Sequence, residues 1–209
     1  MDTTPQIAAA TPAEALQRLV DGNNRWVSDT LLRPDQTAAR RKDLTGGQSP
    51  FAVIFSCIDS RVPPEIVFDQ GLGDLFVLRT AAHTLDELIE ASVEYGPVEL
   101  GTPLIVVMGH QSCGAVTAAV EAIEHGTSLP AHLPDIVDAV TPSYVRDSDT
   151  PGTIDATVRR HIHLTAESLR NDESLKMLMD DGRLDIVEAY YSLADGAIEW
   201  HPRQPTLRS

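Results

Sequence analysis

Three short, uninterrupted runs of apolar residues constrain the fold of this chain more than any other feature. They occupy residues 51–55, 75–78 and 104–108. Each run has the length of a strand, and strands that are apolar on both faces are typical of a parallel sheet covered by helices on either side. The segments between the runs carry helix signals and no hairpin turn, so the pattern predicts an α/β fold.

The carboxyl-terminal part of the chain extends this sheet. Residues 184–193 should form a further strand, and a turn at residues 194–196 leads into a short strand at residues 197–200. A tight turn between two strands makes them antiparallel. The predicted fold is therefore a central, mostly parallel sheet with an antiparallel edge strand, flanked by helices.

Capping patterns locate the helices. Thr11, Pro12 and Glu14 are typical of a helix start, and this first helix should reach about Val27. Gly126 should end another helix that begins near Ser112. The remaining helices are expected from Thr84 to an end or kink at Tyr95-Gly96-Pro97, and over residues 154–170 and 172–180, with an exposed loop at residues 141–153.

The pattern shows no internal repeat and no domain linker. We therefore expect a single domain over residues 1–209. Within it, residues 11–45 should form roughly an N-terminal helical arm, and residues 50–200 roughly the α/β core.

The net charge narrows the classes of partner. The chain has 31 Asp and Glu residues against 16 Lys and Arg, a formal net charge of −15. This balance repels nucleic acid and anionic membrane surfaces, so neither is an expected partner. The sequence has no apolar stretch long enough to span a bilayer and no signal-peptide pattern at its start, so a cytoplasmic location is expected.

Two cysteines and a histidine form a candidate metal site. Cys57 follows the first predicted strand, and His110 and Cys113 follow the third in His-x-x-Cys spacing. The carboxyl ends of parallel strands meet at one edge of a sheet, where open α/β folds bind ligands. Gly109 and Gly114 should give this second turn backbone freedom. Two thiolates and an imidazole suit Zn²⁺ and leave its fourth position for water, as in catalytic zinc sites.

Asp59 and Arg61 add a carboxylate and a guanidinium beside Cys57. If the backbone there is extended, residues 57, 59 and 61 point to the same side. Asp59 could then occupy the fourth zinc position, which gives an inactive, closed state. It could instead pair with Arg61 and accept a hydrogen bond from a zinc-bound water, which gives a competent state.

Charge counting predicts the pH dependence of such a site. Zn²⁺ with two thiolates and a neutral histidine is formally neutral. Its water should therefore be less acidic than in a three-histidine site, where the pKa falls to about 7. We expect activity to rise toward alkaline pH.

The paired motifs resemble those of the β-class carbonic anhydrases. The resemblance begins with Cys57-x-Asp59-x-Arg61 and Gly109-His110-x-x-Cys113-Gly114. It extends to about Gly126 and returns more weakly at residues 182–196. Other matching segments are Gly22-Asn23-x-Arg25-Trp26, Gly47-Gln48-x-Pro50, Gly71-x-Gly73-Asp74-x-Phe76 and Arg79-Thr80-Ala81.

The resemblance implies reversible hydration of carbon dioxide, in which zinc-bound hydroxide attacks the carbon and bicarbonate leaves. By this similarity Cys57, His110 and Cys113 are zinc ligands, and Asp59 and Arg61 form a dyad that orients or gates the metal-bound water. A homodimer or homotetramer is implied, with the active site near the dimer interface and the first helix embracing the partner subunit.

The resemblance also implies a substrate pocket. Gln48 matches a glutamine that reaches substrate across the dimer interface, and Phe76, Ala81 and Tyr95 match positions that line a narrow apolar pocket. The chain departs from the family after Arg79, where Thr80-Ala81-Ala82-His83 replaces Asn-Ala-Gly-Asn, and at Gly96-Pro97. A regulatory bicarbonate site is not expected, because Ile54 replaces the tryptophan that such sites use.

Three other functions remain open at this stage. The same site could hydrolyse a sulfur analogue such as carbon disulfide or carbonyl sulfide. A chain locked with Asp59 on the metal would be a non-catalytic zinc or bicarbonate sensor, although Arg61 argues against permanent locking. Thiol redox chemistry would need two metal-free cysteines close together. For His83, a hydrogen-bonded or solvated side chain is favoured over a role in proton transfer.

Overall fold

The computed structural model describes residues 11–147 and 149–201. Its centre is a five-stranded sheet with the strand order β2-β1-β3-β4-β5. Neighbouring strands are parallel, except that β4 and β5 are antiparallel. The strands are β1 (Ala52–Cys57), β2 (Leu75–Thr80), β3 (Leu104–His110), β4 (Asp185–Tyr191) and β5 (Ile198–His201). The predicted fold class is therefore confirmed.

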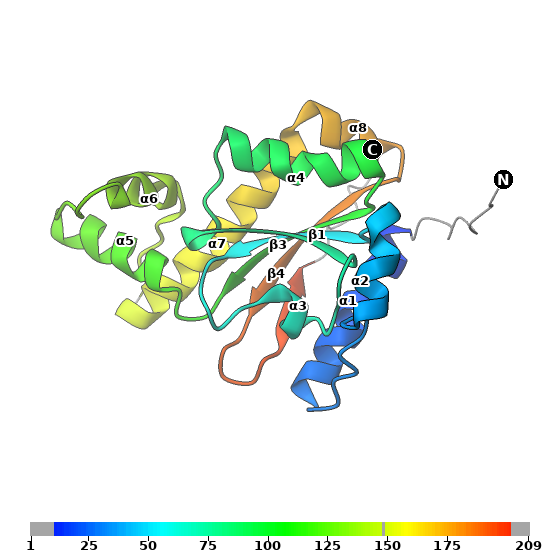
Figure 1. The fold of residues 1–209 in the computed structure, drawn as a ribbon. Helices are drawn as coiled ribbons and strands as arrows, with labels where there is room; N and C mark the ends of the chain where they lie inside the picture. Colours follow the sequence, from blue (N-terminus) through cyan, green and yellow to red (C-terminus); the bar gives the residue numbers. More distant parts are fainter. Residues whose placement is uncertain (1–10, 148, 202–209) are drawn as a thin grey trace, which may run out of the picture.

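Helices cover both faces of the sheet (Figure 1). They are α1 (Pro12–Val27), α2 (Ala38–Asp43), α3 (Pro64–Val67), α4 (Glu87–Leu100), α5 (Gly114–His125), α6 (Leu133–Val140), α7 (Thr150–Asn171) and α8 (Glu173–Asp180). The 3₁₀ turns in the described part of the chain are η1 (Leu44–Gly46), η2 (Ala81–His83) and η3 (Thr141–Ser143). Among the described residues, no helix has the length and apolarity needed to cross a membrane.

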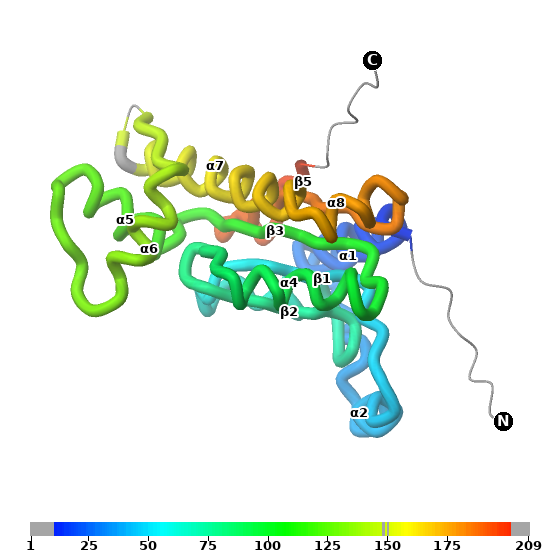
Figure 2. The backbone as a smooth tube through the Cα atoms, turned by 90° about the horizontal axis from the view of Figure 1, so that it is seen from above, coloured from blue at the N-terminus to red at the C-terminus, as the bar shows by residue number. Residues whose placement is uncertain are grey.

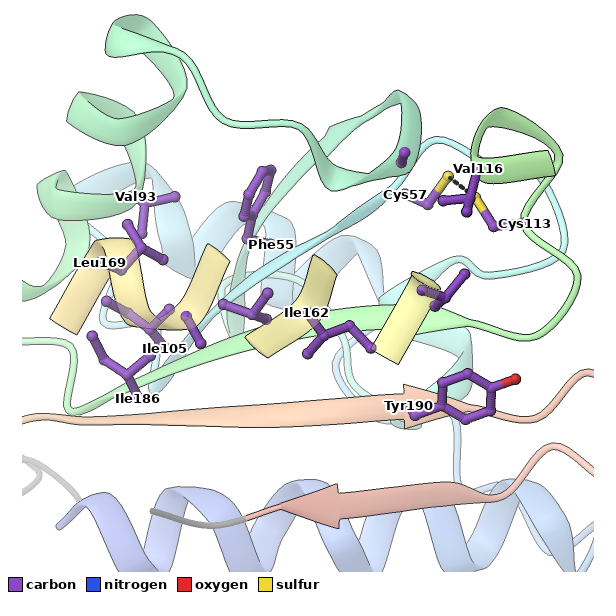
Figure 3. Packing of buried hydrophobic residues seen from close by; sticks show 14 of the residues in the cluster. Phe55, Cys57, Val93, Ile105, Cys113, Val116, Ile162, Leu169, Ile186 and Tyr190 are labelled. Carbon is purple, nitrogen blue, oxygen red and sulfur yellow. Dashed lines mark hydrogen bonds between the residues drawn. The ribbon is translucent and has the colours of Figure 1, made fainter. Parts of the chain in front are cut away.

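Two clusters of buried side chains, one on each face, hold these layers together. On one face, Leu19 of α1 and Phe68 after α3 belong to a cluster with the sheet residue Ile54. On the other face, residues from α4, α5, α7 and α8 belong to a cluster with Phe55 and Cys57 of β1 (Figure 3). Because side chains alternate along a strand, Cys57 shares the face of Phe55. The end of β1 thus carries a thiol into the edge of the larger cluster.

The N-terminal arm begins as predicted. Thr11 and Glu14 form a capping box, with Glu14 N–H donating to Thr11 Oγ1 at 3.3 Å and Thr11 N–H donating to Glu14 Oε2 at 2.8 Å. Helix α1 packs on its own sheet, where Leu19 is fully buried. Helix α2 instead extends away from the sheet and buries none of its residues (Figure 2). Residues 1–10, 148 and 202–209, part of the predicted single domain, lie outside the described residues.

Helix α4 differs from the prediction. It begins at Glu87, capped by Asp86 and not by Thr84, and it continues through Pro97 to Leu100. Gly96 packs closely against β1 and β2, where a Cβ would lie 2.8 Å from Val53 Cγ2. Burial of this helix against the sheet outweighs the lost proline hydrogen bond.

The connection from α5 to α7 is more helical than predicted. The sequence patterns did not indicate α6, and the predicted loop at residues 141–153 ends early because α7 starts at Thr150. Its N-cap is Asp149, whose carboxylate accepts a hydrogen bond from Gly152 N–H at 2.6 Å. The bounds of the short helix α2, within the predicted helical arm, and the short helix α3 were also not predicted, since helices of six and four residues carry little periodic signal.

Candidate metal centre

Two parallel strands bring the candidate ligands together. Strands β1 and β3 lie side by side, so Cys57 and His110, their last residues, reach the same edge of the sheet. Cys113 occupies the N-cap position of α5, three residues later. The ligand atoms of these three buried residues all lie within 4.8 Å of one another. The two Sγ atoms are 3.8 Å apart and face each other (Figure 3).

The imidazole of His110 is oriented for coordination. Its Nδ1 lies 2.9 Å from the Gln111 carbonyl oxygen, which assigns the proton to Nδ1 and leaves a lone pair on Nε2. Nε2 is buried and has no hydrogen-bond partner among the described residues. An unpaired buried acceptor is costly unless a ligand completes it. The geometry of His110 therefore fits a metal ligand.

The two thiols influence each other. The hydrogen bond from Cys113 stabilises a thiolate at Cys57 and holds the pKa of Cys57 well below its usual range. The same interaction, together with burial, raises the pKa of Cys113. One negative charge is thus favoured without a cation, and the second thiolate requires a positive charge between the sulfurs. This donor set fits a thiophilic metal ion.

Asp59 and Arg61 form an ion pair beside this group. Asp59 accepts hydrogen bonds from Arg61 Nε at 2.9 Å and Nη2 at 2.7 Å, and Asp59 Oδ2 lies 3.9 Å from His110 Nε2. The hydrogen bonds from Arg61 lower the pKa of Asp59 to about 2. The condition of an extended backbone from Cys57 to Arg61 is not met. Strand β1 ends at Cys57, and Val62 N–H donates to the Asp59 carbonyl at 3.1 Å to close a turn.

Gly109, which precedes His110, acts differently from the prediction. Gly109 lies inside β3, and a Cβ there would come within 2.6 Å of Ile162 on α7. It therefore permits close packing of helix on sheet and provides no turn. The left-handed residue of the turn is Ser112, with φ of 52°. Its carbonyl accepts a hydrogen bond from Arg61 Nη2 at 3.3 Å, which ties the two ligand-bearing segments together.

The expected pocket residues do not all gather at this group within one chain. Ala81 directly follows Thr80, the β2 partner of Cys57, so its backbone lies at the same edge of the sheet as the metal group. Phe76 pairs with Val53, about 13 Å further along the strand, where its ring meets Tyr95 at 6.1 Å between centroids. Gln48 is exposed and precedes β1, whereas Cys57 ends it.

His83 is neither hydrogen-bonded nor solvated, contrary to the prediction. Its side chain is 1% exposed, and neither ring nitrogen has a partner among the described residues. The ring lies 4.6 Å from that of His161, and burial lowers its pKa well below the usual value. A neutral, buried histidine therefore packs beneath the ends of the strands.

The motifs gave no role to Gln111. It orients His110 through its carbonyl oxygen, while its own N–H donates to the Tyr191 carbonyl at 2.9 Å. Its side-chain Oε1 accepts from Leu193 N–H at 3.1 Å and Ala194 N–H at 3.2 Å. No local pattern signals such a residue, because its partners lie 82 and 83 positions away in the sequence.

Comparisons with known proteins agree with this arrangement. Residues 52–198 match a family model described as carbonic anhydrase. Carbonic anhydrase 2 of Mycobacterium tuberculosis is 43% identical over 187 residues, covering 88% of this chain and 90% of that protein. The carbonic anhydrase of Mycolicibacterium smegmatis is 42% identical over 192 residues, covering 91% of this chain and 93% of that protein.

Solved structures share the fold. Tetrameric β-carbonic anhydrases of Sordaria macrospora match with a TM-score of 0.71 at 19% identity, over 88% of this chain and 95% of theirs. Coccomyxa β-carbonic anhydrase, solved with acetazolamide, matches with a TM-score of 0.70 at 20% identity, over 88% of this chain and 85% of its own. Identities this low establish a common architecture.

Proposed function

Because the chain belongs to the carbonic anhydrase family, we propose that it is a zinc enzyme that interconverts carbon dioxide and bicarbonate. The observation that carries this proposal is the buried group of Cys57, His110 and Cys113, whose ligand atoms converge from two strands and a helix start. When bound there, Zn²⁺ would acidify water and so supply the nucleophile for the carbon atom. Three protein ligands leave the fourth position free for this purpose.

Asp59 and Arg61 would complete the site. Asp59 lies 3.9 Å from His110 Nε2, so its carboxylate is within reach of a water molecule beside the three ligands. Paired with Arg61, it would accept a hydrogen bond from that water and orient it. Released from Arg61, the same carboxylate could occupy the open position and close the site. The pair would therefore act as an orienting and gating dyad.

The pocket residues support a homodimer with the active site near its interface. Gln48, Phe76 and Tyr95 lie away from the metal group of their own chain, so they could line the pocket of a second copy. The exposed helix α2 is the part of the arm that could reach this partner. A homotetramer would use the same dimer as its building block. Two free, buried thiols suit a reducing compartment, so the cytoplasm is the proposed location.

The test combines metal analysis with a stopped-flow assay of carbon dioxide hydration. We expect one zinc per chain and hydration that increases toward alkaline pH, because two thiolates neutralise the charge of the metal. Cys113→Ser should lose both zinc and activity. The control is His132→Asn, which changes an exposed histidine and leaves all three candidate ligands in place. It should retain both zinc and activity.

Other outcomes of the same assays would replace this proposal. Stoichiometric zinc with background hydration at all alkaline pH values would favour a sensor locked by Asp59. Faster turnover of carbon disulfide than of carbon dioxide would indicate the sulfur-analogue reaction. Native protein without metal would favour thiol redox chemistry, for which the 3.8 Å separation of the two Sγ atoms is suitable.

A further inference from the structure

Arg79 of β2 donates hydrogen bonds to the backbone of the segment that carries Cys57 and Asp59. Its Nε donates a hydrogen bond to the Cys57 carbonyl oxygen at 2.8 Å, and its Nη2 donates to the Asp59 carbonyl oxygen at 2.5 Å. One half-buried guanidinium therefore spans the backbone of a candidate metal ligand and of the acid beside it. The carboxylate of Asp59 pairs with Arg61. The hydrogen bonds from Arg79 go instead to backbone carbonyl oxygens.

These hydrogen bonds hold the backbone where the regular pairing of β1 with its neighbouring strands ends, at Cys57. Beyond Cys57, the Ile58 N–H still donates to the Thr80 carbonyl at 3.0 Å, but the chain then turns. The Asp59 carbonyl oxygen accepts from Val62 N–H at 3.1 Å to close that turn. Arg79 uses the second lone pair of the same oxygen. The direction of the Asp59 peptide group is thus fixed from both sides.

We propose that Arg79 is a positioning residue of the metal centre, a role that rests on the proposed function and deepens it. By holding the two carbonyl oxygens, it would set where the Asp59 carboxylate stands relative to Arg61 and the open position beside His110. The relevant separations are 2.7 Å to Arg61 Nη2 and 3.9 Å to His110 Nε2. A small rotation of the Asp59 peptide would change both.

The geometry of the guanidinium, more than its charge, accounts for this role. Arginine presents parallel N–H groups in a rigid plane, which matches two neighbouring oxygen acceptors. Lysine has a single ammonium on a flexible stem and cannot hold both carbonyls in the same arrangement. Arg79→Lys should therefore fail to replace arginine, although it keeps the positive charge. This expectation separates positioning from a general electrostatic effect.

The experiment compares Arg79→Met and Arg79→Lys with the control Arg160→Met, which changes an exposed arginine on α7. All proteins are prepared with zinc and checked for zinc content and oligomeric state. We expect both Arg79 variants to bind one zinc per chain. Their kcat for hydration should fall by about 10- to 100-fold, with KM changed by less than about threefold. Arg160→Met should match the wild type.

A second measurement does not depend on activity. Cobalt(II) is substituted for zinc, and its visible absorption reports the geometry around the metal. The bands should shift in both Arg79 variants and remain unchanged in Arg160→Met. If Arg79→Met does not fold, Arg79→Lys decides the question through the same two measurements.

The outcomes distinguish this proposal from the proposed function. Wild-type kcat in Arg79→Lys would overturn it, as would an unchanged cobalt spectrum in either Arg79 variant. If the wild-type protein itself showed no hydration, the proposed function would fail. The cobalt spectra would still decide whether Arg79 positions the site.

Discussion

Asp59 is held in a setting that keeps it ionised at neutral and alkaline pH. Hydrogen bonds from the Arg61 side chain lower its pKa to about 2. A carboxyl group whose pKa is lowered on folding stabilises the native state above its unfolded pKa of about 4. That contribution disappears as the pH falls through about 2. The ion pair is therefore complete wherever activity is expected.

Asp59→Asn is the most direct test of this residue. Asparagine keeps the shape of the side chain but loses the negative charge. That charge pairs with Arg61 and strengthens the hydrogen bond that the side chain accepts from water. We expect zinc to remain bound and kcat/KM for hydration to fall by about 10- to 100-fold at alkaline pH. Asp181→Asn, an exposed change after α8, should have no effect. Full activity in Asp59→Asn would remove Asp59 from the mechanism.

Thr153, Thr157 and His161 form a stripe of buried polar side chains at every fourth position of helix α7. This stripe is hydrogen-bonded to the segment that precedes the helix. Four helical residues rise about 6 Å, and two extended residues rise about 6.6 Å, so the two repeats match. Residues 143, 145 and 147 therefore each meet one member of the stripe. The pairs are Ser143 Oγ with His161 Nδ1 (2.9 Å), Val145 N–H with Thr157 Oγ1 (3.2 Å) and Asp147 N–H with Thr153 Oγ1 (3.0 Å).

Thr157→Val tests this stripe. Valine has nearly the same shape as the fully buried Thr157, but it leaves the N–H of the half-buried Val145 without its acceptor. We expect the free energy of unfolding to fall by about 1–3 kcal/mol, with zinc content unchanged. Denaturant titration measures this effect. Thr127→Val is the control because Thr127 is exposed. Equal midpoints for the two variants would show that the stripe does not stabilise the fold.

We expect residues of a second copy of the chain to complete each active site. Strand β2 forms one edge of the sheet, and its residues are half-buried in the single chain. Phe76 and Tyr95 contact each other near this edge, away from the metal group, and Tyr95 is 53% exposed. A second copy placed along this edge would cover these side chains and bring them to the opposite site.

Complementation between two impaired variants tests this arrangement. In a mixed dimer of Asp59→Asn and Gln48→Ala, one site carries both defects and the other carries none. If Gln48 serves the partner's site, co-refolding the two variants should restore activity at about a quarter of all sites, since about half of the dimers are mixed. Each variant refolded with itself should stay impaired. A mixture no more active than its components would place Gln48 in its own chain's site or outside the site.

Short-range patterns in the sequence predicted much of the fold and of the candidate site. The apolar runs at β1, β2 and β3 indicated a parallel sheet, because the strands of a sheet covered by helices on both faces are almost continuously apolar. Strands β1 and β3 are buried throughout, as this interpretation requires. The capping box at Thr11 and the left-handed Gly126 marked helix ends through bonds within a few residues. The candidate ligand group was recognisable because its residues lie at or just after strand ends, and strand ends are visible in the sequence.

Long-range packing set the remaining features. Pro97 stays inside α4 because Gly96 lets the helix lie against β1, a contact between segments far apart in the chain. Arg79 and Gln111 gain their roles from carbonyl and amide groups on other strands and turns. His83 is enclosed beside His161 for the same reason. Local propensity fixes which segments form helices and strands, whereas the hydrogen bonds of Arg79 and of the Gln111 side chain join residues that meet only after folding.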